Sequence, residues 1–381
     1  MRLVKSVPPL AAALVVAMLG MGCGGGGAYP KHDALGSGES LTQAGALNAR
    51  NLAELQLHHS RAVVSPQPWA AYWWPYVGSG IANGWRDPDN LAPADKYDRA
   101  YRGAHEPLAD WERARHGPGL ANVASWWGHC NGWAAAALMV SEPRLPKFIN
   151  GVSFGVRDQK ALLAESWMEF SGDFIGTRVD EEKDLSSAAF WDVVPAQFHL
   201  VLTNIVGKQN HGLILDRHTG HEIWNQPLVA YDIAPITRDD YLGSHPSYPD
   251  IYRVNVTARI WWANDAIGPD EITPPFDMEK LHEEYFDHFF PGRLLRYELW
   301  LDAPAEFDAQ GKLVRSGDIL ITRRNDVYVG GAWKNGINPA LLAHTHPDYM
   351  WVPFSQQRSS GYKNPRIDDQ WVRANIGEPA H

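Results

Sequence analysis

The sequence predicts an α+β fold in which a helix that carries a cysteine packs on an antiparallel sheet, with an additional β-rich C-terminal part. Two stretches lead to this prediction. Residues 125–139 contain a glycine-bearing turn, then Cys130, then a run of helix formers from Ala134 to Met139. Residues 197–233 alternate apolar and polar side chains in three segments separated by two turns, which is typical of an antiparallel meander. With 45% hydrophobic and 20% charged residues, the 381-residue chain is globular and can bury a substantial core.

The N-terminus predicts export. Residues 1–22 combine a short positive start with an apolar stretch too short to span a bilayer, which is the pattern of a signal peptide. Cys23 stands at the predicted cleavage point, so we expect lipidation of Cys23 and a flexible, glycine-rich linker over residues 23–43. The small residues before Cys23 also suit ordinary signal cleavage. The sequence therefore predicts either a cell-envelope lipoprotein or a freely secreted protein.

Composition excludes several classes of partner. The formal net charge of −10 argues against nucleic acid and against anionic lipid surfaces, so we expect membrane contact only through the lipid anchor. Two cysteines in an exported chain, one of them in the leader, exclude a scaffold built on disulfides. The 17 tryptophans could form a surface that binds glycan or peptide, although large aromatic side chains more often build cores.

The remaining elements divide between a predicted catalytic core, residues 44–270, and a C-terminal part packed on it, residues 271–381. The pattern of apolar and turn residues predicts helices over 41–57, 158–170 and 278–290, an irregular aromatic segment over 69–83, and strands over 152–156, 295–301, 318–322 and 327–329.

Two features raise the question of a metal. The acidic run at 180–184 is read as a solvated loop, with a calcium site as the alternative. His344 and His346 could form a metal pair, but no third ligand stands at a suitable spacing, so no zinc site is predicted there. We expect no organic cofactor.

Cys130 is the candidate nucleophile. A tight turn that delivers a thiol to the start of a helix places it near unpaired N–H groups and the positive end of the helix dipole, which favour the thiolate. The alternative is a buried cysteine that only fills space. We prefer the nucleophile because of the glycines around Cys130 and because an unpaired thiol is unusual in an exported protein. The backbone N–H of Cys130, with the indole of Trp126 or Trp127, would then hold an oxyanion.

Two histidine pairs in the meander could complete a catalytic triad. His199 begins the first predicted strand, 197–203, and Asp216 ends the second, 212–216; folding the hairpin between them places the two side chains opposite one another. Alternatively, His211 begins the second strand and Asn225 lies in the third, 223–233. A cysteine helix followed by such a meander is how papain-like and transglutaminase-like sites are assembled. We favour His199 and Asp216 and keep His211 and Asn225 as the alternative.

Several blocks of sequence resemble the transglutaminase elicitor family, the oomycete elicitor-type transglutaminases and their bacterial relatives. The two specific blocks are WWGHCNGWAAA at 126–136 and IWNQPL at 223–228, and supporting blocks occur at 69–85, 198–207, 330–336 and 346–353. The resemblance implies an extracellular, calcium-stimulated protein-glutamine γ-glutamyltransferase with a papain-like site and Cys130 as nucleophile. It also covers the block that contains His199. After Pro227 the sequence departs from the family's more basic elicitor peptide.

We therefore expect a transglutaminase that forms a thioester between Cys130 and a glutamine side chain and passes the acyl group to a primary amine. Its partners would be protein substrates: a glutamine donor and a lysine or other amine acceptor. A papain-like cysteine protease and a glutamine deamidase use the same groups and are the enzymatic alternatives. The alternative without catalysis is a tryptophan-rich envelope lipoprotein that binds glycan or peptide.

Overall fold

The computed structural model describes residues 40–41, 45–84, 91–104, 106–176, 193–220, 222–245, 248–280, 284–324, 327–338, 343–356 and 363–377. The predicted signal peptide, Cys23 and the acidic run at 180–184 lie outside these residues. Export, lipidation and calcium binding by that run therefore stay predictions. None of the helices in the described part of the chain has the length and apolar character that crossing a bilayer requires.

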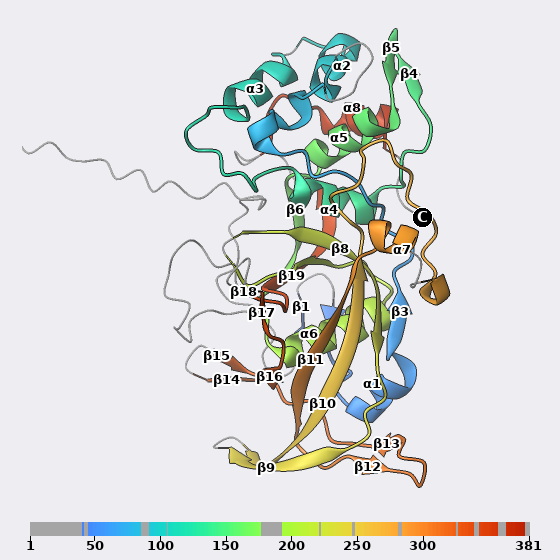
Figure 1. Cartoon of the computed structure of the whole chain (residues 1–381), viewed down its shortest axis with the longest axis vertical. Helices are drawn as coiled ribbons and strands as arrows, with labels where there is room; N and C mark the ends of the chain where they lie inside the picture. The colour runs from blue at the N-terminus through green and yellow to red at the C-terminus, as the bar shows by residue number, and fades with distance from the viewer. Residues whose placement is uncertain are drawn as a thin grey trace, which may run out of the picture.

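The helices gather mainly at one end of the molecule (Figure 1). In the described ranges the α-helices are α1 (Leu52–His58), α2 (Pro93–Ala100), α3 (Leu108–Arg115), α4 (Cys130–Met139), α5 (Val156–Ser166), α6 (Pro195–Val201), α7 (Glu284–Phe289) and α8 (Asp369–Asn375). Shorter helical turns are η1 (Tyr76–Gly78), η2 (Gly80–Ala82), the π-helical η3 (Leu202–Lys208) and η4 (Met278–Lys280).

The strands form one large antiparallel sheet and several hairpins. In chain order they are β1 (Ser40–Leu41), β2 (Gly45–Ala46), β3 (Arg61–Val63), β4 (Lys147–Ile149), β5 (Val152–Phe154), β6 (Phe170–Gly176), β7 (Ile214–Asp216), β8 (Asn225–Ile233), β9 (Asp239–His245), β10 (Tyr248–Trp262), β11 (Gly292–Leu301), β12 (Glu306–Phe307), β13 (Leu313–Arg315), β14 (Thr322–Arg324), β15 (Val327–Val329), β16 (Ala332–Trp333), β17 (Ile337–Asn338), β18 (Ala343–His344) and β19 (Tyr349–Gln356). Among the described residues, nine strands make up the large sheet, in the order β16-β11-β10-β8-β7-β19-β6, with β3 paired to β8 and β9 to β10.

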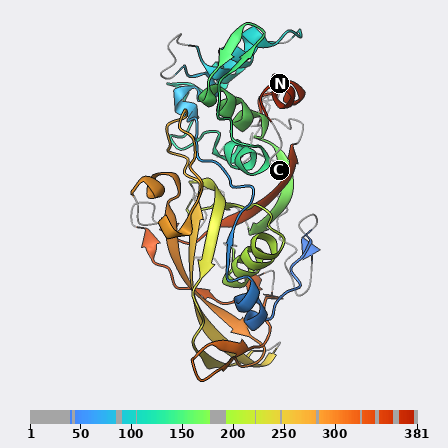
Figure 2. The same ribbon diagram turned by 90° about the vertical axis from the view of Figure 1, so that its right-hand side faces the viewer.

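The sheet joins segments that are far apart in the sequence. β10 and β11 form a long hairpin that extends to the end of the molecule opposite α2 and α3, while α6 lies beside its lower half (Figures 1 and 2). β19 inserts between β7 and β6, so strands from both sides of residue 270 share one sheet. α4 packs on β8 and β19 and, on its other side, against α5.

Helix α4 begins at Cys130, as predicted, and apart from Asn131 its side chains are apolar. Its residues from Cys130 to Leu138 are buried, because the sheet covers one side and α5 the other. Gly132 allows this close approach: a Cβ there would lie 1.9 Å from the carbonyl oxygen of Ala164 on α5. The glycine is therefore explained by helix packing, and it gives no support to a turn built for a thiol.

The predicted strand over 197–203 is wrong. These residues form α6 and the start of η3, because Pro195 opens the helix and the side chain of Gln197 accepts a hydrogen bond from the N–H of Val194 at 3.0 Å. Every residue of α6 is buried, so its short apolar run could not distinguish a helix from a strand. The predicted helix over 41–57 is also shorter than expected and covers only α1.

Candidate active site

Cys130 lies in the interior at the start of α4. The residue is 0% exposed, and its sulfur lies 4.0 Å from the carbonyl oxygen of Ile223, just before β8. The structure has Cys130 in a disulfide, whereas we predicted an unpaired thiol. The described residues contain no second cysteine. In this state Cys130 is not a nucleophile, and chemistry at its sulfur requires reduction.

Three polar side chains on neighbouring strands face the start of α4; we call Asp216, Asn225 and Tyr349 the Asp216 row. Asp216 on β7 is directly opposite Asn225 on β8, so the two side chains share one face of the sheet. The hydroxyl of Tyr349 on β19 donates to Oδ1 of Asn225 at 3.1 Å. Asn225 in turn donates to Oδ1 of Asn131 at 3.3 Å. Since Asn131 follows Cys130 in α4, the row faces the cysteine end of the helix.

The Asp216 carboxylate is held by the backbone that leads into β8. Its Oδ1 accepts a hydrogen bond from the N–H of Trp224 at 2.9 Å, and its own carbonyl accepts one from Asp348 at 3.3 Å. The indole of Trp224 packs edge-on against that of Trp73, with ring centroids 5.6 Å apart. Aromatic rings thus border the row at Asp216.

His199 is not brought together with Asp216. Because α6 replaces the predicted strand, the hairpin that would have placed the two side chains opposite one another does not exist. In the described structure Nδ1 of His199 contacts the hydroxyl of Tyr297 on β11, at 2.9 Å. Burial lowers the pKa of His199 to about 3, so its imidazole is neutral.

His211 lies at the opposite end of α4 from Cys130. A Cβ on the neighbouring Gly212 would lie 2.5 Å from Cδ2 of Leu138, and the His211 ring is 5.0 Å from that of Phe354. Leu138 is eight residues beyond Cys130, which corresponds to about 12 Å along the helix. His211 and Asn225, the alternative pair, are therefore also far apart, because Asn225 lies at the Cys130 end of α4.

The tryptophans before Cys130 lie in the segment that leads into α4. Trp126 and Trp127 are half-buried and contact each other edge-on, with centroids 6.1 Å apart. The indole nitrogen of Trp127 is buried and has no hydrogen-bond partner among the described residues. No tryptophan of the described ranges is among the exposed large apolar side chains, so the structure gives no support to a tryptophan-rich binding surface.

Two further histidines flank the Asp216 row. His218 follows β7, and Arg217 and Arg293 lie beside it; burial and these two guanidinium groups lower its pKa to about 3. His346 precedes β19 and stacks on Trp333, with ring centroids 4.6 Å apart and an interplanar angle of 3°. The N–H of Thr219 donates to the carbonyl of His344 at 3.4 Å, so the segment that carries His346 runs beside the end of β7.

A cluster of buried ionisable side chains that we did not predict surrounds His129, the residue before Cys130. We call Glu112, His116, His129 and Glu165 the His129 cluster. Nε2 of His129 is 2.6 Å from Oε2 of Glu165, and Nδ1 of His116 is 2.8 Å from Oε2 of Glu112. Burial alone would lower the pKa of His129, but the carboxylates of Glu165 and Glu112 outweigh it and raise the pKa. The Glu112–His116 spacing of one helical turn was the available sequence signal.

This donor set does not fit the calcium ion that the family resemblance implies. Among the described residues, Glu112, His116 and His129 form the one group of histidine, cysteine and acidic side chains placed to hold a metal. Ca²⁺ takes six to eight oxygen ligands, and two of these three ligands are imidazoles.

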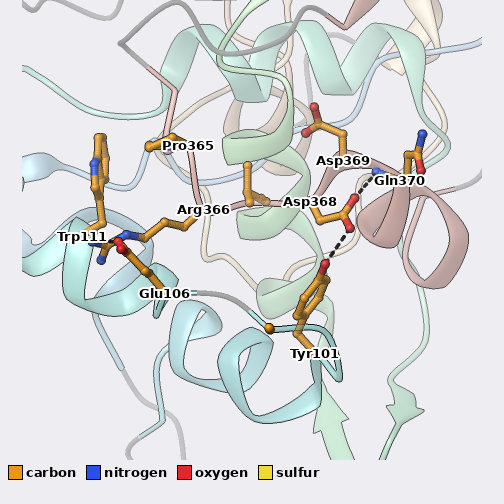
Figure 3. Close-up of a pocket in the computed structure, with 10 residues that line it drawn as sticks. Tyr101, Glu106, Trp111, Pro365, Arg366, Asp368, Asp369 and Gln370 are labelled. Atoms are coloured by element: carbon orange, nitrogen blue, oxygen red, sulfur yellow. Dashed lines mark hydrogen bonds and ion pairs between the residues drawn. The ribbon is translucent and has the colours of Figure 1, made fainter.

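The polar cavity in Figure 3 is lined by no member of the His129 cluster. It has a volume of about 740 Å³ and lies between the loop after α2 and the start of α8, where the Tyr101 hydroxyl bonds the carboxylate of Asp368 at 2.9 Å. Neither Cys130 nor any residue of the Asp216 row lines it.

Comparisons with known proteins confirm the predicted family resemblance. Residues 112–248 match the family model described as transglutaminase elicitor. The fold is similar to the crystal structure of the GP42 transglutaminase from Phytophthora sojae, with a TM-score of 0.56 and 19% sequence identity over 86% of this chain and 93% of that chain. No curated protein matches the sequence.

Proposed function

We propose that the protein is a protein-glutamine γ-glutamyltransferase whose nucleophile is the reduced thiol of Cys130. The observation that carries this proposal is the Asp216 row, which faces the start of the helix on which Cys130 stands. Two comparisons support it: the matched family segment contains Cys130, Asp216 and Asn225, and the overall fold is similar to that of a transglutaminase.

The proposed reaction divides one difficult transfer into two steps. The thiolate of Cys130 attacks the side-chain amide carbon of a glutamine, the C–N bond breaks, and ammonia leaves with a proton from the catalytic base. A primary amine then attacks the thioester carbonyl and regenerates the thiol. Backbone N–H groups at the start of α4 and the indole of Trp127 would hold the developing oxyanion.

We further propose that His346 is the base, in place of His199 or His211. Its segment runs beside the end of β7, and the stack on Trp333 fixes the plane of its ring. His218 is the matched control: burial lowers the pKa of both histidines to about 3, and Arg293 lies beside both, but Arg217 lies beside His218 alone. We expect His346→Ala to lower turnover by several orders of magnitude and His218→Ala to have a much smaller effect.

An amine-incorporation assay tests the proposed function. Reduced protein is incubated with a casein-like glutamine donor and a labelled primary amine, with and without calcium, because the family resemblance implies stimulation by calcium. We expect incorporation of the amine and release of ammonia, with no new peptide termini. Fragmentation of casein without incorporation would identify a protease, and release of ammonia alone a deamidase.

Because of the disulfide, the first control is to run the amine-incorporation assay with and without a reductant. Without a reductant we expect little or no incorporation, because a sulfur in a disulfide cannot attack an amide. A thiol reductant should restore activity in wild-type protein and have no effect in Cys130→Ala. Equal activity with and without a reductant would mean that Cys130 is not held in a disulfide in the active protein.

A further inference from the structure

The His129 cluster joins three helices, α3, α4 and α5, at one buried point. Glu112 comes from α3, His116 follows that helix, His129 precedes Cys130, and Glu165 belongs to α5. Each of the four residues is at most 3% exposed. One nitrogen or oxygen from each of Glu112, His116 and His129 lies within 4.8 Å of the others.

The second donor atom of three of these side chains is already held by the surrounding structure. Oε1 of Glu112 accepts from the side chain of Asn364 at 2.8 Å, and Oε1 of Glu165 accepts from the backbone of Asn364 at 2.6 Å. Nδ1 of His129 lies 3.2 Å from the carbonyl oxygen of Trp74, which fixes Nδ1 as the protonated nitrogen. Outer contacts of this kind orient ligands in metal sites and leave the other donor atom directed at the ion.

The remaining donor atoms of Glu112, His116 and His129 converge within 4.8 Å, and Glu165 joins them through its contact with His129. Nε2 of His129 is 2.6 Å from Oε2 of Glu165 and 3.7 Å from Oε2 of Glu112, which is itself 2.8 Å from Nδ1 of His116. The rings are fixed as well, because Tyr76 stacks on His116 at 3.5 Å between centroids and meets His129 edge-on.

A glycine leaves the space beside the cluster open. Gly80 has φ +54°, and a Cβ there would lie 2.7 Å from Cε1 of His129 and 3.0 Å from Oε2 of Glu112. Any larger residue would therefore displace the donor atoms.

We propose that Glu112, His116, His129 and Glu165 bind one divalent transition-metal ion, with Zn²⁺ the best match. Two imidazole nitrogens and two carboxylate oxygens suit a four-coordinate zinc ion. The ion also balances charge, since two carboxylates offset its two positive charges and both imidazoles are then neutral. The hydrogen bonds between these side chains are the contacts that the ion would replace.

The site would act structurally. It ties α3, α5 and the segment around Asn364 to the residue just before Cys130, and so fixes the start of α4. This inference does not rest on the proposed function, because it concerns metal content and stability and requires no turnover.

The test uses the whole purified protein without a polyhistidine tag. Metal content is measured by inductively coupled plasma mass spectrometry, and the thermal midpoint is measured after chelation and after addition of Zn²⁺. We expect about one ion per chain, a lower midpoint after chelation and recovery with Zn²⁺. Glu112→Gln should lower metal affinity at least tenfold. His288→Gln, which alters an exposed His–Glu pair at 3.0 Å, should leave it unchanged.

A second variant covers the case in which Glu112→Gln does not fold. In His116→Cys a thiolate replaces an imidazole, so Co²⁺-loaded protein should gain a sulfur-to-metal charge-transfer band that wild-type protein lacks. The proposal is wrong if chelated wild-type protein binds none of Zn²⁺, Mn²⁺, Fe²⁺ and Co²⁺. It is equally wrong if Glu112→Gln binds metal as wild type does, or if the cobalt spectrum of His116→Cys is that of wild type.

Discussion

His129 and His199 are both fully buried, yet their surroundings are opposite. His129 lies among the carboxylates of Glu112 and Glu165 at the helical end of the molecule, and its pKa is raised. His199 lies on α6 beside the long hairpin, where its ring meets Tyr297 and its pKa falls to about 3. A buried histidine thus pairs with carboxylates in one region and is a neutral residue of the core in the other.

The difference extends beyond these two histidines. Around α5, buried charged groups are paired, as in Lys96–Asp158 at 2.6 Å and Lys160–Glu142 at 2.8 Å. Around α6, the partners are aromatic: the rings of Phe198 and Tyr297 meet edge-on at 5.8 Å. Substitutions should therefore cost most where they leave a buried charge without its partner.

The largest effect on stability is expected for Glu165→Ala. Removing this carboxylate leaves His129 buried without its closest charged partner, so the free energy of unfolding should fall by about 3–5 kcal/mol. Urea denaturation of the variant and of wild-type protein, both in chelator, measures the difference. A loss below about 1 kcal/mol, the value typical of exposed pairs, would mean that the contrast between the two regions is wrong.

His199→Phe should have an intermediate effect. The aromatic ring keeps most of the packing, but the hydroxyl of Tyr297 loses its partner, which costs about 1–3 kcal/mol. Amine incorporation should persist. Loss of turnover by several orders of magnitude in folded protein would return His199 to the role of catalytic base.

The two histidines should also give opposite pH dependences. Between pH 6.5 and about 3 the unfolded chain binds a proton at His199 that the folded chain excludes, so this histidine destabilises the protein as pH falls, by up to about 1.4 kcal/mol per pH unit. The raised pKa of His129 has the reverse sign: its contribution is complete below pH 6.5 and is lost as pH rises through the folded value.

Unfolding curves of His199→Phe, His129→Gln and wild-type protein in chelator, measured from pH 5 to pH 8, separate the two contributions. Differences from wild type that have the same sign of slope for both variants would contradict the assignment.

The smallest effect is expected for His288→Gln. Its contact with Glu271 spans 3.0 Å, but both side chains are more than 40% exposed, so solvent screens the interaction. We expect a change within about 1 kcal/mol. A larger loss would show that exposure does not separate the weak pairs of this protein from the strong ones.

The sequence predicted the elements whose local signals are strong. The helix that starts at Cys130, the strand that ends at Asp216 and the third strand of the meander were all found, because turn residues bound them. The strand over 197–203 was wrong because a fully buried segment has no polar face to reveal its period. β19, which supplies Tyr349 to the Asp216 row, was missed because its pairing with β7 joins residues more than 130 positions apart.

The histidines were harder to assign for the same reason. Spacing along the meander suggested a histidine partner for Asp216. In the sheet, β19 instead brings Tyr349 into the Asp216 row, and neither His199 nor His211 lies in that row. The His129 cluster combines residues 112 to 165 with a backbone contact from Asn364, and only the folded chain shows that these converge. The motif around Cys130 was informative because the turn and the helix that form it follow one another directly in the sequence.

The most direct test of the account is the rate of amine incorporation by Cys130→Ala under reducing conditions, beside reduced wild-type protein with the same unfolding midpoint. The substitution removes one sulfur atom at the start of α4, so the fold should persist while incorporation falls to background. Retention of more than a few per cent of wild-type turnover by the folded variant would contradict the central claim that Cys130 is the nucleophile.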